Sequence, residues 1–153
     1  MLRLAFAITL FNVGLIFPAA AEDHVLISAD QLKWVPAPPS FPKGAQVAVL
    51  AGDPSKEGLY VIRLKTPAGY KVPPHTHPHD ENLTVISGTF NLGKGPTLDE
   101  KAVHTLKAGG FMKMPKGMQH SAWFSEESIV QIHGMGPQGI IYVNPADDPR
   151  KSN

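Results

Sequence analysis

Three histidines lie close together in the sequence, at His75, His77 and His79, and Glu81 follows two residues after the last of them. A β-strand points alternate side chains to opposite faces, so His75 and His77 would project to one side, and Glu81 shares their parity. Neutral imidazole nitrogens and a carboxylate oxygen suit a divalent first-row metal. The fourth donor must come from elsewhere, and His120, which follows a Pro-Lys-Gly turn, is the obvious candidate. The sequence therefore predicts a mononuclear metal site.

Short β-rich runs must bring these residues together. They are separated by glycine and proline turns, and no amphipathic helix is convincing. Many short strands in one chain without a dividing linker indicate a single all-β sandwich or barrel. The predicted strands are 46–50, 59–64, 81–87, 89–92, 102–106, 111–114, 119–124, 128–133 and 139–143.

The spacing of glycines and metal-site residues resembles the two motifs of the cupin superfamily. The first motif corresponds to Gly69, His75-Thr76-His77, Glu81 and Gly88, and the second to Gly109, Pro115-Lys116-Gly117 and His120. Phe124 stands where the second motif often has an asparagine, which is not a metal ligand. The resemblance implies a small single-domain bacterial cupin with an RmlC-like jelly roll, also called a double-stranded β-helix, over 46–143. It also implies one metal held by His75, His77, Glu81 and His120, and a homodimer.

The remaining polar candidates are less specific. Candidates for a catalytic base are Tyr60, Lys113, Gln131 and His133. Gln131 and His133 share one face of the run 128–133. If that face points into the barrel, Gln131 and His133 could orient a substrate. If it points outward, the alternating Val130 and Ile132 form the core. The sequence leaves both alternatives open. We predict solvent-exposed positions for His79, Asp80 and His104, and core positions for Tyr60, Phe111, Met114, Trp123, Phe124 and Tyr142.

The two ends of the chain are predicted to lie outside the barrel. Residues 1–21 combine Arg3, an apolar run and a small-residue cleavage site, which is the pattern of a secretory signal peptide and is too short for a spanning helix. We therefore expect a periplasmic or secreted protein that is free of the membrane after cleavage. The Pro-rich segment 22–45 is predicted to be a surface arm, and 144–153 a surface tail.

Composition narrows the function further. The chain has no cysteine, which excludes disulfides, thiolate metal sites and cysteine nucleophiles. Loss of Arg3 with the signal peptide would leave equal numbers of basic and acidic residues, which disfavours a nucleic-acid partner. The predicted partner is a small-molecule ligand or substrate.

The functional hypothesis is an exported metalloenzyme for oxidation, decarboxylation or isomerisation of a small organic acid or phenolic compound. The alternative is a non-catalytic cupin that binds or senses a small ligand. The residues do not choose among Zn, Cu, Fe, Mn and Ni. Because a metal acquired after export is selected by affinity, we expect Zn or Cu in the protein as isolated.

Overall fold

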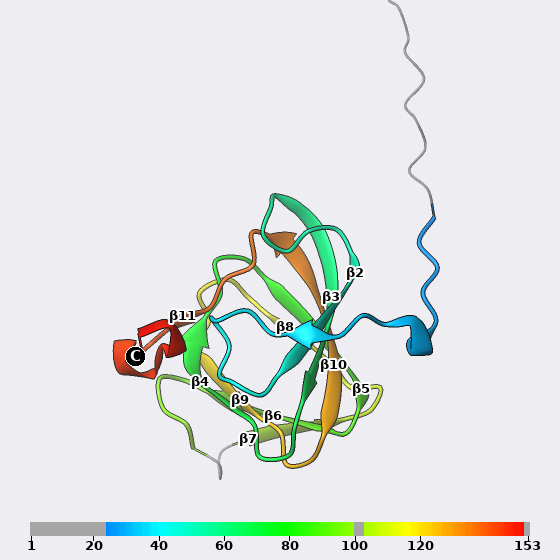
Figure 1. Cartoon of the computed structure of the whole chain (residues 1–153). Helices are drawn as coiled ribbons and strands as arrows, with labels where there is room; N and C mark the ends of the chain where they lie inside the picture. Colours follow the sequence, from blue (N-terminus) through cyan, green and yellow to red (C-terminus); the bar gives the residue numbers. More distant parts are fainter. Residues whose placement is uncertain (1–23, 100–102, 152–153) are drawn as a thin grey trace, which may run out of the picture.

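The computed structural model describes residues 24–99 and 103–151 and shows two antiparallel sheets that face each other (Figure 1). The predicted signal peptide, 1–21, lies outside the described residues. In spatial order the first sheet contains β1 (Val35–Pro36), β2 (Gln46–Ala51), β3 (Gly58–Thr66), β10 (Ser128–Gly136), β5 (Glu81–Ser87) and β8 (Phe111–Met114). The second contains β11 (Ile141–Tyr142), β4 (Lys71–Thr76), β9 (His120–Trp123), β6 (Thr89–Lys94) and β7 (Val103–Lys107). The all-β prediction is confirmed.

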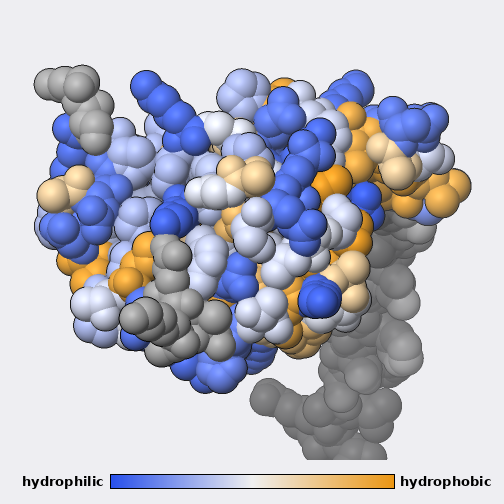
Figure 2. Space-filling model, turned by 90° about the horizontal axis from the view of Figure 1, so that it is seen from below, coloured by the Kyte–Doolittle hydropathy of each residue, from blue (hydrophilic) through white to orange (hydrophobic). Residues whose placement is uncertain are grey.

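The described part of the chain has only three short helical turns, all of the 3-10 type. They are η1 (Ala29–Gln31), η2 (Pro145–Asp147) and η3 (Pro149–Lys151). Among the described residues no helix is long and apolar enough to cross a membrane. Viewed from below, the surface is mostly hydrophilic, with hydrophobic residues in smaller patches between the polar ones (Figure 2).

The core lies between the two sheets, where alternate residues of each strand point inward. In β10, Val130 and Ile132 are buried, while Gln131 and His133 are only half-buried. Gln131 instead accepts a hydrogen bond from Nε of Arg63, at 3.3 Å, on the neighbouring strand β3. Of the two alternatives for this strand, the external position of Gln131 and His133 is therefore the one observed.

The residues predicted to lie in the core are buried, with one exception. Tyr60, Met114, Trp123, Phe124 and Tyr142 are at most 9% exposed. Phe111, however, is 55% exposed, so its predicted core position is wrong. The reason is register: Phe111 pairs with Thr84 on β5, whose inward residues are Leu83 and Val85.

Strand β4 was not among the predicted runs because prolines occupy two of its positions. Proline lacks the N–H that a strand ladder needs, which argues against a regular central strand. The structure accommodates Pro73 and Pro74 with a register shift between Val72 and His75 in the pairing with β9. This irregularity lies directly before His75 and sets the point at which the strand regains its pairing.

The predicted surface arm is packed on the barrel. Its strand β1 pairs with β2, and Phe41 is only 8% exposed within the hydrophobic core. Two buried phenols bind the backbone of the arm: the hydroxyl of Tyr70 donates to the carbonyl of Pro42 at 2.7 Å, and that of Tyr142 to Ser40 at 2.8 Å. Proline removes a backbone donor from a strand ladder, but it does not prevent an extended segment from pairing at a sheet edge or from packing by its side chains.

The C-terminal segment is mostly exposed, as predicted, but it is attached to the body. Asp148 is buried and pairs with Arg150, whose Nη2 donates to the carbonyl of Ile140 at 3.1 Å. This hydrogen bond joins the tail to the residue that precedes β11.

Candidate metal centre

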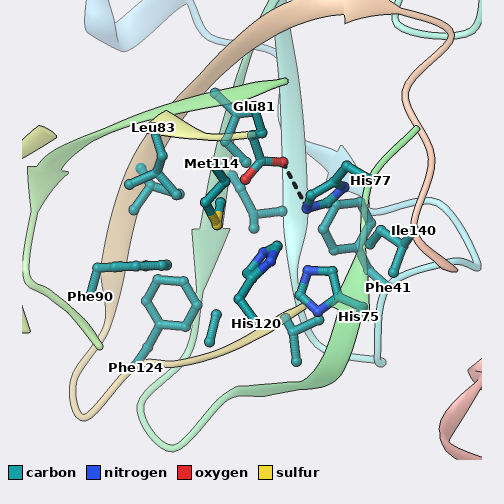
Figure 3. Close-up of a pocket in the computed structure, with 15 residues that line it drawn as sticks. Phe41, His75, His77, Glu81, Leu83, Phe90, Met114, His120, Phe124 and Ile140 are labelled. Carbon is teal, nitrogen blue, oxygen red and sulfur yellow. Dashed lines mark ion pairs between the residues drawn. The ribbon is translucent and has the colours of Figure 1, made fainter. Parts of the chain in front are cut away.

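Three imidazoles converge in the barrel interior from two distant parts of the chain. His75 lies near the end of β4 and pairs directly with His120, the first residue of β9, while His77 follows β4 immediately. Their ring centroids are 4.2 Å apart for His75 and His120, 4.9 Å for His75 and His77, and 5.1 Å for His77 and His120. One ring nitrogen of each lies within 4.8 Å of the others, and all three side chains are buried (Figure 3). This arrangement could hold a metal ion.

Backbone carbonyls determine which nitrogen of each imidazole faces the cluster. The Nδ1 atom of His75 lies 2.7 Å from the carbonyl oxygen of Pro73. The Nδ1 atom of His77 lies 2.7 Å from the carbonyl oxygen of Gly139, and that of His120 lies 3.0 Å from the carbonyl oxygen of Met118. A carbonyl can only accept, so each Nδ1 carries the proton and donates it. In the neutral ring the lone pair is then on Nε2, the form in which imidazole binds a metal.

The surroundings of His77 fit a cation at this position. Its Nε2 is buried without a hydrogen-bond partner, although the Glu81 carboxylate Oε2 lies 3.3 Å away. With the proton on Nδ1, a lone pair on Nε2 would face a carboxylate oxygen, which is repulsive unless a positive charge lies close to both. A divalent ion coordinated by the three imidazoles would supply that charge.

Burial keeps the imidazoles of His75 and His120 in the neutral form. It holds the pKa of His75 well below its ordinary value, with further lowering by His120 and His77. Burial likewise lowers the pKa of His120 to about 4. Burial raises the pKa of the Glu81 carboxyl, and His77 offsets part of that rise. Neutral imidazoles do not have to lose a proton before they bind a metal at pH 7.

Comparison with known proteins places this geometry in a family. Residues 22–138 match the ChrR Cupin-like domain. The chain belongs to this cupin family. The polyketide cyclase RemF from Streptomyces resistomycificus has a similar fold, with a TM-score of 0.66 over 83% of this chain and 90% of that chain, at 16% sequence identity. An acetylacetone dioxygenase from Acinetobacter johnsonii gives a TM-score of 0.61 over 80% and 79% of the two chains, at 22% identity.

These similarities confirm the predicted jelly-roll fold and the predicted membership of the cupin superfamily. A nitrosourea synthase from Streptomyces achromogenes is 30% identical over 118 residues, which cover 71% of this chain. The matched region spans only 22% of the synthase, so most of that protein has no counterpart in this match.

Glu81 is not a member of the group of three histidines whose ligand atoms all lie within 4.8 Å of one another, although its Oε2 is 3.3 Å from Nε2 of His77. It is the first residue of β5 and only 6% exposed, so its carboxylate is aimed into the interior next to His77 (Figure 3). Its coordination of the metal stays a prediction.

The other candidates are distributed around the site. Tyr60 is buried and lines a narrow cavity with His77 and Glu81. Burial and the nearby Glu81 raise the pKa of its phenol, so the phenol keeps its proton at pH 7. Gln131 and His133 are on the outer side of β10, so the structure does not support a direct role for them at the cluster. Lys113 forms an ion pair with Asp80 at 2.8 Å.

The interior cavity of the cupin is small and mainly apolar. Its volume is about 30 Å³, enough for one or two water molecules. Apart from the three histidines and Glu81, its described lining is hydrophobic: Phe41, Leu64, Val72, Leu83, Phe90, Met114, Ala122, Phe124, Val130, Ile132 and Ile140. Two of these, Phe41 and Ile140, come from segments that sequence reasoning did not connect with the site.

Acidification should destabilise the metal-free protein through His120. Its pKa is about 4 in the folded state and 6.5 when unperturbed, so between these values the unfolded chain binds a proton that the folded chain does not. Stability is therefore lost as the pH falls from 6.5 towards 4, by on the order of 3 kcal/mol. Glu81 acts in the opposite direction because its pKa is raised.

The contribution of His120 can be isolated by denaturant unfolding of the wild type and His120→Asn at pH 7 and pH 4. The stability advantage of the wild type over the variant should shrink at pH 4. An advantage that is the same at both values would contradict the neutral, buried state of this imidazole.

Removing the metal should lower the stability of the cupin without unfolding it. A ligand that binds only the folded state adds about 3 kcal/mol when its free concentration is roughly a hundred times its Kd. The continuous hydrophobic core, however, does not depend on the ion. Far-UV circular dichroism after chelation should keep its β-sheet signal while the denaturation midpoint falls. Complete loss of the β-sheet signal would contradict this expectation.

Proposed function

We propose that this cupin is an exported mononuclear metalloenzyme that oxidises a small organic acid or phenolic compound. The observation that carries the proposal is the convergence of three buried imidazoles, each held by a backbone carbonyl so that Nε2 faces the other two. When bound, a divalent Zn, Cu, Fe, Mn or Ni ion would supply Lewis acidity or, if redox-active, one-electron chemistry.

The described residues favour oxidation over decarboxylation and isomerisation. The latter two usually require a separate acid or base to move protons on the substrate. Glu81 is the only carboxyl in the described lining of the interior cavity, and Tyr60 holds its proton. The hydrophobic lining would keep water away from the reacting groups, which suits an oxidation that relies on the metal. The fold similarity to an acetylacetone dioxygenase adds support.

A cupin that binds or senses a small ligand without turnover is the second candidate. The small, apolar cavity favours this candidate, because a volume of about 30 Å³ without further polar side chains in its described lining provides little catalytic machinery. Turnover separates the two candidates, since both require the ion and a small-molecule ligand.

The test is metal analysis followed by oxygen uptake with a panel of small carboxylates and phenols. Protein purified from the periplasm or medium should contain one Zn or Cu per chain, and the copper-loaded form should consume oxygen with at least one compound. His77→Ala should do neither. Stoichiometric Mn as isolated would contradict the expected metal. Ligand binding without oxygen uptake in any metal form would favour the sensing function.

Export and dimerisation are part of the proposal. The sequence of residues 1–21 supports export, and N-terminal sequencing of the mature protein should begin at Glu22. The family resemblance supports a homodimer, which light scattering coupled to size-exclusion chromatography would test.

A further inference from the structure

The interior cavity cannot contain the body of an organic substrate. Its volume of about 30 Å³ is a small fraction of the roughly 150 Å³ of an apolar cavity that can hold a benzene molecule. A carboxylate with several carbons needs several times that space. Its apolar part must therefore occupy another cavity that adjoins the three-histidine cluster.

One such space is a groove of about 280 Å³ between the edges of the two sheets. We call it the outer groove. Strand β7 is an edge of one sheet and β8 an edge of the other, and the groove is lined from β6, β7, β8 and the turn after β8. Five of its lining residues are apolar: Leu92, Leu106, Met112, Met114 and Met118.

The outer groove is continuous with the inward-facing side of the barrel. Residues that pair directly across antiparallel strands point to the same face. Met112 pairs with the buried Leu83 of β5, and Met114 with Glu81. On the opposite side, Lys94 at the end of β6 pairs with His120. The groove residues therefore extend the face that carries the candidate metal centre.

Met114 separates the outer groove from the interior cavity. It is the one described side chain that lines both spaces, and it is only 2% exposed. Figure 3 shows it beside Glu81 and His120. Methionine is unbranched and adapts its shape easily, so its side chain can move aside at a lower cost than a branched or aromatic residue.

The rim of the groove carries positive charge that the described protein does not neutralise. Lys94 is exposed, forms no ion pair with the described residues, and stands at the rim with His104. The third basic residue, Lys113, is paired with Asp80. An apolar floor with an ammonium at its edge that has no ion-pair partner among the described residues is complementary to an organic anion with an apolar body.

A second groove meets the interior cavity at Ile140, but its chemistry is different. Its volume is about 180 Å³, and its described lining is formed by prolines, serines, Gln138, Gly139 and Ile140, with no charged side chain. It offers neither a countercharge for an anion nor a flexible side chain at the junction.

We propose that the outer groove binds a small organic anion, with its carboxylate paired to Lys94 and its apolar body against Leu106 and the methionines. We further propose that Met114 is the side chain displaced when a ligand passes from the groove to the three-histidine cavity. This second part rests on the proposed metal function, whereas the binding of the anion does not.

The binding is tested by calorimetric titration with octanoate and with octan-1-ol as its neutral counterpart. Lys94→Gln should weaken octanoate binding by about tenfold or more, as expected for loss of a charge-assisted hydrogen bond, and leave octan-1-ol binding within about twofold. Lys116→Gln, which removes an exposed lysine outside the groove, should change neither. Octanoate binding that is unchanged by Lys94→Gln, or absent in the wild type, would overturn the proposal.

The passage is tested with azide on the copper(II)-loaded protein, followed by its charge-transfer absorption in stopped flow. Met114→Ala should speed azide binding by more than Ile140→Ala, the same kind of truncation at the other groove. Octanoate should slow azide binding in the wild type and not in Lys94→Gln, a comparison that does not depend on the folding of the Met114 variant. Acceleration by Ile140→Ala alone would overturn the assigned route.

The two proposals can fail separately in these experiments. If no azide band forms in any variant, the metal function is wrong, and the octanoate titration still decides whether the groove binds anions. If the band forms but octanoate neither binds nor competes, the groove proposal is wrong and the metal function stands.

Discussion

Replacing His77 by alanine should lower the affinity of the protein for a divalent metal by at least about a hundredfold. Mutation of residues that only orient a metal ligand typically costs ten- to a hundredfold, and loss of a ligand should cost more. His77 is also the neighbour of the Glu81 carboxylate, so the variant leaves a buried acidic group beside only two imidazoles. Metal content by mass spectrometry and competition with a chromophoric chelator would measure the change.

His79→Ala is the matched control for this experiment. The substitution is the same and lies two residues away, but His79 is outside the group of converging imidazoles. It should leave metal content unchanged. His75→Ala and His120→Ala should behave like His77→Ala, because each removes one of the three facing nitrogens. Full metal content in any of these three variants would show that the predicted ligand set is wrong.

The three-histidine cluster could be predicted from the sequence because both of its parts lie in short, recognisable stretches of the chain. Strand parity places His75 and His77 on one face, and motif spacing identifies His120 as the distant partner. The orientation of the imidazole rings could be predicted from the sequence only in part. Pro73 and Met118 each lie two residues before the histidine that they orient, but Gly139 lies 62 residues from His77. Nothing in the sequence marks a backbone carbonyl for such a role.

The sequence left the orientation of one strand open and gave a wrong position for one aromatic residue. In β10 both alternating sets are compatible with burial, since Gln131 and His133 could serve a polar interior; the neighbouring Arg63, on a separate strand, binds Gln131 on the outer face. Phe111 and Met114 are three residues apart in one strand, so they lie on opposite faces, and the pairing with β5 buries Met114 and turns Phe111 outward. Which of the two alternating sets of a strand is buried depends on its pairing partners, and strand periodicity alone does not specify them.

Replacing Phe41 by alanine should destabilise the protein by about 3 to 5 kcal/mol, the usual cost of truncating a buried phenylalanine. Phe41 belongs to the Pro-rich segment, is 8% exposed and lines the interior cavity together with His75 and His77. Its removal would enlarge a cavity that already exists beside the imidazoles. Denaturant unfolding of the metal-free protein measures the loss without a contribution from the ion.

Phe111→Ala provides the matched control, because it is the same chemical change at a residue that is 55% exposed. It should alter the free energy of unfolding by no more than about 0.5 kcal/mol. Equal effects of the two substitutions would mean that the segment around Phe41 is the surface arm that its prolines suggest. A large difference would show that this segment forms a wall of the metal cavity, so that the barrel core includes residues preceding the first long strand.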